Sequence, residues 1–300
     1  MQNLELLKLI IEPKVEDKAN PARRWSVPFP RNFVAGLLSE AYIREVRSRG
    51  YEPQESESVM QKIHAVSRWL TDASTKPFLL LYGENPGTGK TTLAKAIYRV
   101  ISEEIPAMKK RLEYAIFVDG GLRDSIRNKA NERIKDILPP ELRELFFSNP
   151  HDGWGKLSDG YPEIYNRAVI INRKCGNAID AIFRKLDSVP CLDDRQLVFA
   201  SSHQLVIDAE QGGRDSLWRY NAKFLILDDV GAEADSVNHM GNRILPITEV
   251  LLERYDHRKI TIITSNLSDD GLADMYGARV ADRLNEVADK IAFMGNSFRK

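Results

Sequence analysis

The stretch LLLYGENPGTGKTTLAKAI, residues 79–97, restricts the possible folds more than any other part of the chain. Its apolar beginning is short and bounded, as in a buried strand, and Leu93, Ala96 and Ile97 have the spacing of a helix that packs on a sheet. A buried strand joined to a helix by a glycine-rich loop is typical of an α/β fold. We therefore expect a parallel sheet flanked by helices, with this loop at the end of one strand.

The loop itself has the pattern of a P-loop, which binds the phosphates of a nucleotide. Gly87 and Gly89 let backbone N–H groups turn inward, and the N-terminus of the following helix adds partial positive charge. Lys90 is placed to reach the β- and γ-phosphate oxygens, and the Thr91 hydroxyl to ligate Mg²⁺. The residues expected to contact the nucleotide are Asn85, Pro86, Gly87, Thr88, Gly89, Lys90, Thr91 and Thr92.

The loop departs from the strict P-loop spacing at one position. The spacing G-x-x-x-x-G-K-[ST] requires glycine at position 84, whereas the chain has Glu84, with Gly83 one residue earlier. The second half of the loop, NPGTGKTT, is intact, and this half makes most of the phosphate contacts. The alternative interpretation is a glycine-rich turn that binds nothing.

Two further buried strands are predicted in KFLILDDVGAE, residues 223–233, and KITIITSNL, residues 259–267. A helix is predicted between them, and parallel sheets of this kind bind ligands at the carboxyl ends of their strands. Asp228 is expected to hold Mg²⁺ and Asp229 to polarise the attacking water, while Asn266 contacts the γ-phosphate or orients that water. The alternatives are a capping acid pair and ordinary turn chemistry.

Two arginines lie in the last predicted helix, DMYGARVADRLNEVADKI, residues 274–291. Its expected apolar stripe consists of Val280, Leu284, Val287 and Ile291. Arg279 and Arg283 are four residues apart on a neighbouring face, and either can enter the site of a neighbouring subunit. The alternative is a surface arginine paired with a nearby carboxylate of Asp282, Glu286 or Asp289.

The middle of the chain contains an insertion. The interval from Lys90 to Asp228 is roughly twice as long as two βα units of about 30 or more residues require. Residues 196–209 fit the second strand and its helix, with Ser201 or Ser202 as N-cap, which leaves about 114–193 as a mainly helical insertion. Its aromatic and basic residues can contact nucleic acid, or the insertion is simply a solvated subdomain; the residues are Trp154, Tyr161, Tyr165, Arg167, Arg173 and Lys174.

Bulk composition excludes several classes of protein. The chain has 43 Lys+Arg and 43 Asp+Glu, so any DNA affinity must come from a local patch or from assembly. Cys175 and Cys191 form no paired C-x-x-C cluster, which argues against a disulfide framework or a zinc site and fits a cytoplasmic location. The N-terminus lacks the pattern of a signal peptide, and no segment has the roughly 18 apolar residues of a membrane span, so no membrane association is expected.

Taken in order, five segments resemble the DnaC/DnaI/IstB group of AAA+ ATPases, which are helicase loaders and transposition helper ATPases. The segments are GENPGTGKTT, LVFASSHQL, FLILDDVGAE, TIITSNLS and YGARVADRL. The resemblance covers about residues 58–113 and 194–300, and the ending IAFMGNSFRK looks like the final strand of that family, with no helical lid after it. The insertion has no counterpart in the family.

The resemblance implies a role for each matching residue. Lys90 and Thr91 would form Walker A, and Asp228 and Asp229 Walker B. Asn266 would be sensor 1. The arginine finger acting in trans would be Arg283, with Arg279 as second choice. Such proteins bind ATP and Mg²⁺ between the subunits of rings or filaments, often around DNA, and act on a helicase or transposase.

The expected organisation is therefore an N-terminal appendage at 1–55, which docks a partner or packs on its own domain, and an AAA+ ATPase domain at 56–300 with the insertion inside it. The expected function is ATP hydrolysis by an oligomer that acts on DNA with a protein partner. The alternative is a nucleotide-gated adaptor with little hydrolysis, for which Asp229, one methylene shorter than a glutamate, is weak support. A small-molecule kinase is less favoured, and a GTPase still less, because the chain has no N-K-x-D segment.

Overall fold

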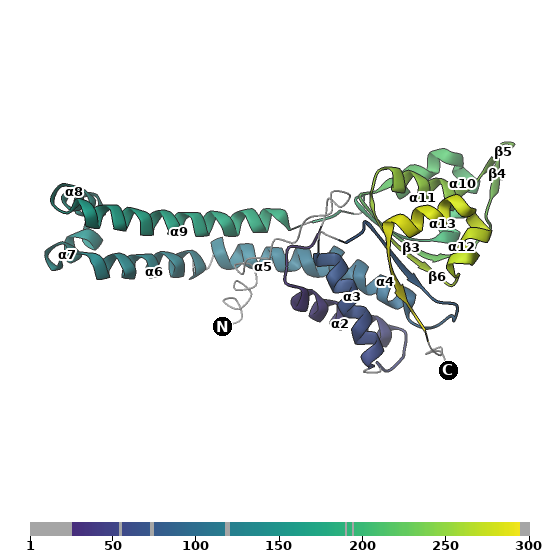
Figure 1. Cartoon of the computed structure of the whole chain (residues 1–300), viewed down its shortest axis with the longest axis horizontal. Coiled ribbons are helices and arrows are strands. Elements are labelled where there is room, and N and C mark those ends of the chain that lie inside the picture. The colour runs from purple at the N-terminus through teal and green to yellow at the C-terminus, as the bar shows by residue number, and fades with distance from the viewer. Residues whose placement is uncertain are drawn as a thin grey trace. The chain divides into compact units, whose positions relative to one another are not determined.

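The computed structural model describes residues 26–53, 56–72, 75–117, 121–189, 191–193 and 195–294. These residues form two compact units (Figure 1). The helical unit contains Ala107–Val189, and the sheet unit contains the described residues of 26–106 and 191–294. In the described part of the chain, no helix combines the length and the hydrophobicity needed to cross a lipid bilayer.

Five strands form one parallel sheet in the order β2-β3-β6-β1-β7. The strands are β1 Phe78–Tyr82, β2 Leu197–Ser201, β3 Phe224–Val230, β6 Ile260–Ser265 and β7 Ala288–Ala292. Every neighbouring pair is parallel, which confirms the predicted α/β class with a parallel sheet. In this order β6 separates β1, which precedes the glycine-rich loop, from β3, which carries the two acids.

Helices cover both faces of the sheet, as the continuously apolar strands require. One layer contains α2 Arg31–Ser48, α3 Glu57–Thr71 and α4 Lys90–Arg99, and the other contains α10 Ser202–Gly212, α11 Pro246–Asp256, α12 Asp269–Tyr276 and α13 Ala278–Val287 (Figure 1). Alternate residues of a strand contact the two opposite layers of helices. Phe224 stacks edge-on with Trp69 of α3 at 6.4 Å between ring centroids, whereas Leu225 belongs to the core shared with α10, α11 and α13.

The described part of the N-terminal appendage packs on the sheet unit. It contains helix α2, whose Val34 and Leu38 are fully buried. The backbone N–H of Val27 donates to the Leu70 carbonyl at 2.8 Å. The remainder of the appendage, which includes Arg23, Arg24 and Trp25, lies outside the described residues.

The helical unit is built on two long antiparallel helices, α6 and α9. Two short helices, α7 and α8, connect the C-terminal end of α6 with the N-terminal end of α9 (Figure 1). The helices in this part of the chain are η1 Val100–Glu104, α5 Ile105–Phe117, α6 Gly121–Ile137, α7 Pro140–Ser148, α8 Pro150–Gly160 and α9 Pro162–Ser188. Trp154 packs between Phe146, at 4.9 Å, and Tyr165, at 5.8 Å between ring centroids. Tyr161 donates its hydroxyl to Glu141 at 2.5 Å. The rings of Trp154, Tyr161 and Tyr165 are thus half-buried and engaged within the unit, and their contact with nucleic acid stays a prediction.

Two details of the predicted elements are wrong. Helix α13 ends at Val287, so Ile291 lies in strand β7 and not on the helical stripe. The reason is long-range pairing, because β7 fills the edge beside β1, with Ala288 opposite Phe78. The predicted final strand begins earlier than the segment IAFMGNSFRK, of which residues 295–300 lie outside the described part.

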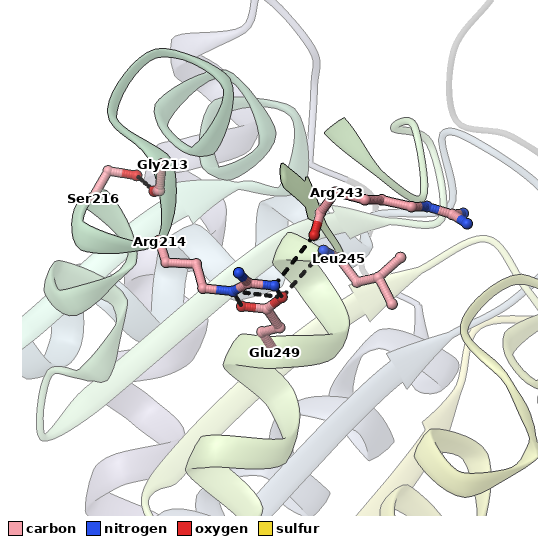
Figure 2. A network of polar contacts seen from close by, with 6 residues as sticks. All are labelled: Gly213, Arg214, Ser216, Arg243, Leu245 and Glu249. Carbon is pink, nitrogen blue, oxygen red and sulfur yellow. Dashed lines mark hydrogen bonds and ion pairs between the residues drawn. The ribbon is translucent and has the colours of Figure 1, made fainter. Parts of the chain in front are cut away.

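A short antiparallel hairpin, β4 Val237–His239 and β5 Asn242–Ile244, follows β3 and was not predicted. Figure 2 shows what holds it to the sheet unit. Arg214, from the 3₁₀ helix η2 Gly213–Asn221, pairs with Glu249 of α11 and also donates to the Arg243 carbonyl at 3.2 Å. Arg214 thus joins the hairpin to η2 and α11, and the His239 ring of β4 contacts the Glu210 carbonyl of α10 at 2.8 Å.

A fully buried arginine joins three segments of the sheet unit. Arg254 of α11 donates to the Thr261 hydroxyl at 2.8 Å and to the carbonyls of Tyr220, at 2.9 Å, and Ala222, at 2.7 Å. Burial lowers the pKa of the Arg254 guanidinium to about 9. The residue therefore links the approach to β3 with the beginning of β6.

We expect Arg254→Met to lower the free energy of unfolding by at least about 3 kcal/mol, because it leaves several buried acceptors without a donor. Arg219→Met is the control, since Arg219 forms an exposed ion pair with Asp208 at 3.3 Å and its loss should cost about 1 kcal/mol or less. Urea unfolding followed by tryptophan fluorescence measures both. Equal effects of the two substitutions would contradict the structural role of Arg254.

Candidate functional site

The polar ends of three adjacent strands meet at the carboxyl edge of the sheet. A cavity of about 480 Å³ lies there, within the size range of small-molecule sites. One side is lined by residues 86–92 together with Asp229, Ala232 and Asn266. The structure therefore brings the predicted P-loop residues together with two of the predicted catalytic residues.

The loop that enters α4 has the geometry of an anion cradle. Gly87 and Gly89 have φ angles of 78° and 95°, in the left-handed region that glycine adopts without strain. Helix α4 begins at Lys90, and no side chain caps its N-terminus. The first backbone N–H groups of the helix therefore have no side-chain acceptor at the cap, which suits the binding of an anionic group.

The structure explains the position of the first glycine in the loop. A Cβ atom at Gly83 would lie 2.3 Å from the carbonyl oxygen of Phe293, so only glycine fits there. Glu84 is exposed. The close approach to the C-terminal segment thus requires glycine one position earlier than the strict spacing predicts.

Lys90 is buried but has only neutral partners. Its side chain is 4% exposed, and its Nζ donates to the carbonyls of Gly83, at 2.7 Å, and Asn85, at 3.0 Å. Burial lowers the pKa of Lys90, and the charges of Asp229 and Asp228 partly oppose this effect. Within the described residues it forms no ion pair. A buried cation without a counter-ion is suited to an anionic ligand.

Asp228 is the buried acid of the site. It is 6% exposed and accepts a hydrogen bond from the Thr264 hydroxyl at 2.6 Å. Burial raises its pKa, the hydrogen bonds from Thr264 and from the Thr91 hydroxyl lower it, and the charge of Asp229 raises it further. The contact with Thr91 places the two predicted magnesium ligands together, and both offer the oxygen atoms that Mg²⁺ prefers.

Asp229 points away from the sheet because a β-bulge interrupts β3. The pairing with β6 shifts register between Leu227 and Val230, and Asp229 has a φ of 58°. Its N–H donates to the Thr264 hydroxyl at 2.8 Å. Asp229 is therefore exposed toward the cavity, where it faces the same space as Asn266.

Neither predicted finger arginine lines the cavity of its own chain. Arg283 lies over the Tyr255 ring at 4.4 Å and pairs with Glu286 at 3.8 Å, which is the surface pairing considered as the alternative. It adjoins Phe78 at the opposite, amino-terminal end of β1. Arg279 is exposed at the beginning of α13 and has no partner within the described residues. Of the two arginines, Arg279 is thus the one that its own chain does not engage within the described residues.

Sequence reasoning missed three groups around the site. Thr264 holds both acids, and its only signal was a hydroxyl within an apolar strand. The wall opposite the loop comes from the end of α2 and the residues after it, which include Tyr42, Arg49 and Tyr51. Glu233, nearly fully buried, accepts a hydrogen bond from the hydroxyl of Tyr276 in α12.

No protein-family model matches this sequence, and a comparison with curated proteins finds no significant similarity. The functional interpretation consequently depends on the residues and their geometry.

We expect Asp228→Asn to raise the free energy of unfolding at pH 8 while removing any activity that needs Mg²⁺. The pKa of Asp228 is raised in the folded protein, so ionisation there costs stability as pH rises through that pKa. The gain should disappear at low pH, where Asp228 is protonated and as neutral as asparagine. Urea unfolding of both proteins between pH 4 and pH 8 tests this. If Asp228→Asn instead lowers the free energy of unfolding at pH 8, the hydrogen bonds to the Asp228 carboxylate compensate fully for the burial of its charge.

Proposed function

We propose that the sheet unit is a P-loop ATPase of the AAA+ type that hydrolyses Mg²⁺-bound ATP. The observation that carries this proposal is Lys90, a buried cation with neutral partners at an uncapped helix N-terminus, inside a cavity that Asp229 and Asn266 also line. The strand order supports it, because the polar ends of β1, β6 and β3 lie side by side.

In this proposal the loop residues 85–92 hold the phosphates, while Thr91 and Asp228 hold Mg²⁺. The ion would supply charge neutralisation at the phosphate oxygens. Asp229 and Asn266 would orient the attacking water. The part of the cavity beside Tyr42 and Tyr51 has room for the base and ribose.

We further propose that the active form is an oligomer acting on DNA with a helicase or transposase. The order of the five motifs supports this, as does the position of Arg279, which is exposed and unpaired within the described residues. In such an assembly Arg279 would complete the site of a neighbouring subunit.

A nucleotide-gated adaptor remains the second candidate. It is favoured by Asp229, which is shorter than glutamate and lies on a bulge, and by Arg283, which its own chain already pairs. The two candidates differ in turnover. An adaptor binds ATP with a near-zero rate that does not change with protein concentration.

We expect the ATPase rate per subunit to rise with protein concentration and to rise further with single-stranded DNA, because neighbouring subunits complete the site. Lys90→Ala should abolish nucleotide binding, since it removes the buried cation. Lys223→Ala, an exposed lysine at the amino-terminal end of β3, is the matched control. Fluorescent nucleotide binding and phosphate release measure these effects. A rate that stays flat and near zero although nucleotide binds would favour the adaptor.

We expect Arg279→Ala to lower turnover at least about 100-fold with ATP binding unchanged, as loss of an arginine finger does. Arg283→Ala should have the smaller effect, since its guanidinium contacts Tyr255. Mixing the inactive Lys90→Ala and Arg279→Ala proteins should restore part of the turnover, because some interfaces then contain both intact residues. If the mixture stays inactive although mixed oligomers form, Arg279 does not act in trans.

A further inference from the structure

Four basic residues occupy related positions on the two long helices of the helical unit. Helices α6 and α9 pack along an inner stripe that includes the buried Ala130, Ile134 and Ala168, and the half-buried Cys175 continues it. Each basic residue comes directly before one residue of this stripe: Lys129, Arg133, Arg167 and Lys174. A displacement of one residue corresponds to about 100° around an α-helix.

Helix geometry places all four on one flank of the helix pair. Because α6 and α9 run antiparallel (Figure 1), a displacement of one residue toward the N-terminus leads to the same side of the pair on both helices. The two positions on α6 are about 6 Å apart along the axis and the two on α9 about 10 Å, with the axes separated by roughly 8–10 Å. The basic flank, as we call Lys129, Arg133, Arg167 and Lys174, thus gathers four charges within a small area.

The charges of the basic flank are not neutralised locally. All four residues are exposed, and none has an ion pair or side-chain hydrogen bond within the described part of the chain. The acids on that side are Asp136, three residues after Arg133, and Glu163, four residues before Arg167, and neither forms an ion pair with the basic flank within the described residues. The chain as a whole has no net charge, so the basic flank is a local patch of the kind that binding to a polyanion requires.

The flank offers charge without a stacking surface. The exposed aromatic residues of the unit, Tyr114 and Phe147, lie in α5 and α7, outside the helix pair. Single-stranded nucleic acid is usually bound by charge together with aromatic stacking, whereas duplex backbones are bound by charge alone. We propose that the basic flank binds the phosphate backbone of duplex DNA, an inference that rests on the proposed DNA-dependent function and adds a duplex contact on the insertion to the single-stranded DNA expected to stimulate turnover.

Two triple variants with equal loss of charge test this proposal in the full-length protein. R133Q/R167Q/K174Q removes two arginines and one lysine from the basic flank, and R127Q/K135Q/R173Q removes the same set from positions of the two helices outside that flank, where all three are also exposed. Dissociation constants for a fluorescent 20-base-pair duplex of mixed sequence are measured at several salt concentrations. The basic-flank variant should bind at least 10-fold more weakly at low salt, and its log–log salt slope should fall by about 2 to 3, since each lost phosphate contact removes about 0.9. The control variant should behave like the wild type.

The proposal is overturned if both triple variants lose the same affinity, if the basic-flank variant binds like the wild type, or if the wild type binds no duplex at low salt. It is also overturned if the basic-flank variant loses as much affinity for a single strand of equal length as for the duplex. Circular dichroism establishes that both variants are folded. ATP turnover without DNA separates this proposal from the proposed function. A wild type that is inactive but shows the expected binding pattern contradicts the ATPase. Normal turnover together with a basic-flank variant that binds duplex like the wild type contradicts only the DNA contact.

Discussion

The hydroxyl of Thr264 is the interaction on which the arrangement of the site depends. It lies fully buried in β6, donates to the Asp228 carboxylate and accepts from the Asp229 N–H, so one group satisfies both sides of the bulge in β3. Without this hydroxyl the Asp228 carboxylate would lose one of its hydrogen-bond donors, and the Asp229 N–H would lose its acceptor. The bulge in turn separates the two acids, with Asp228 inward and Asp229 toward the cavity.

The sequence predicted the parts of the fold that are encoded locally. The strands before the loop and in the acid segment are continuous apolar runs, and the N-cap Ser201 precedes α10 as expected, accepting from the Gln204 N–H at 3.1 Å. Strand β7 was assigned partly to a helix because ADKIA has little apolar character and extends the helical spacing of the residues before it. Its strand conformation depends on pairing with β1, which no local pattern reveals.

The missed parts of the site share a physical cause. Tyr42 and Arg49 reach the cavity only because α2 packs beside α4, a contact between segments far apart in the sequence. For Arg283, the partner Glu286 lies three residues later in α13 and was among those expected from the sequence, whereas the partner Tyr255 comes from α11. Residue type and spacing predicted which side chains can act through their charge. Whether such a side chain is already paired with a residue of another segment depends on the tertiary structure.

The charges of the site are also placed so that they do not neutralise one another. Lys90 and Asp228 interact electrostatically, since the acid affects the pKa of the lysine, yet no ion pair joins them within the described residues. The lysine is instead held by loop carbonyls and the acid by threonine hydroxyls. A cation and a carboxylate that are held apart in advance are complementary to a ligand that carries negative phosphate oxygens together with a divalent cation. This preorganised separation is the strongest physical support for the proposal that the cavity binds a magnesium-bound nucleotide.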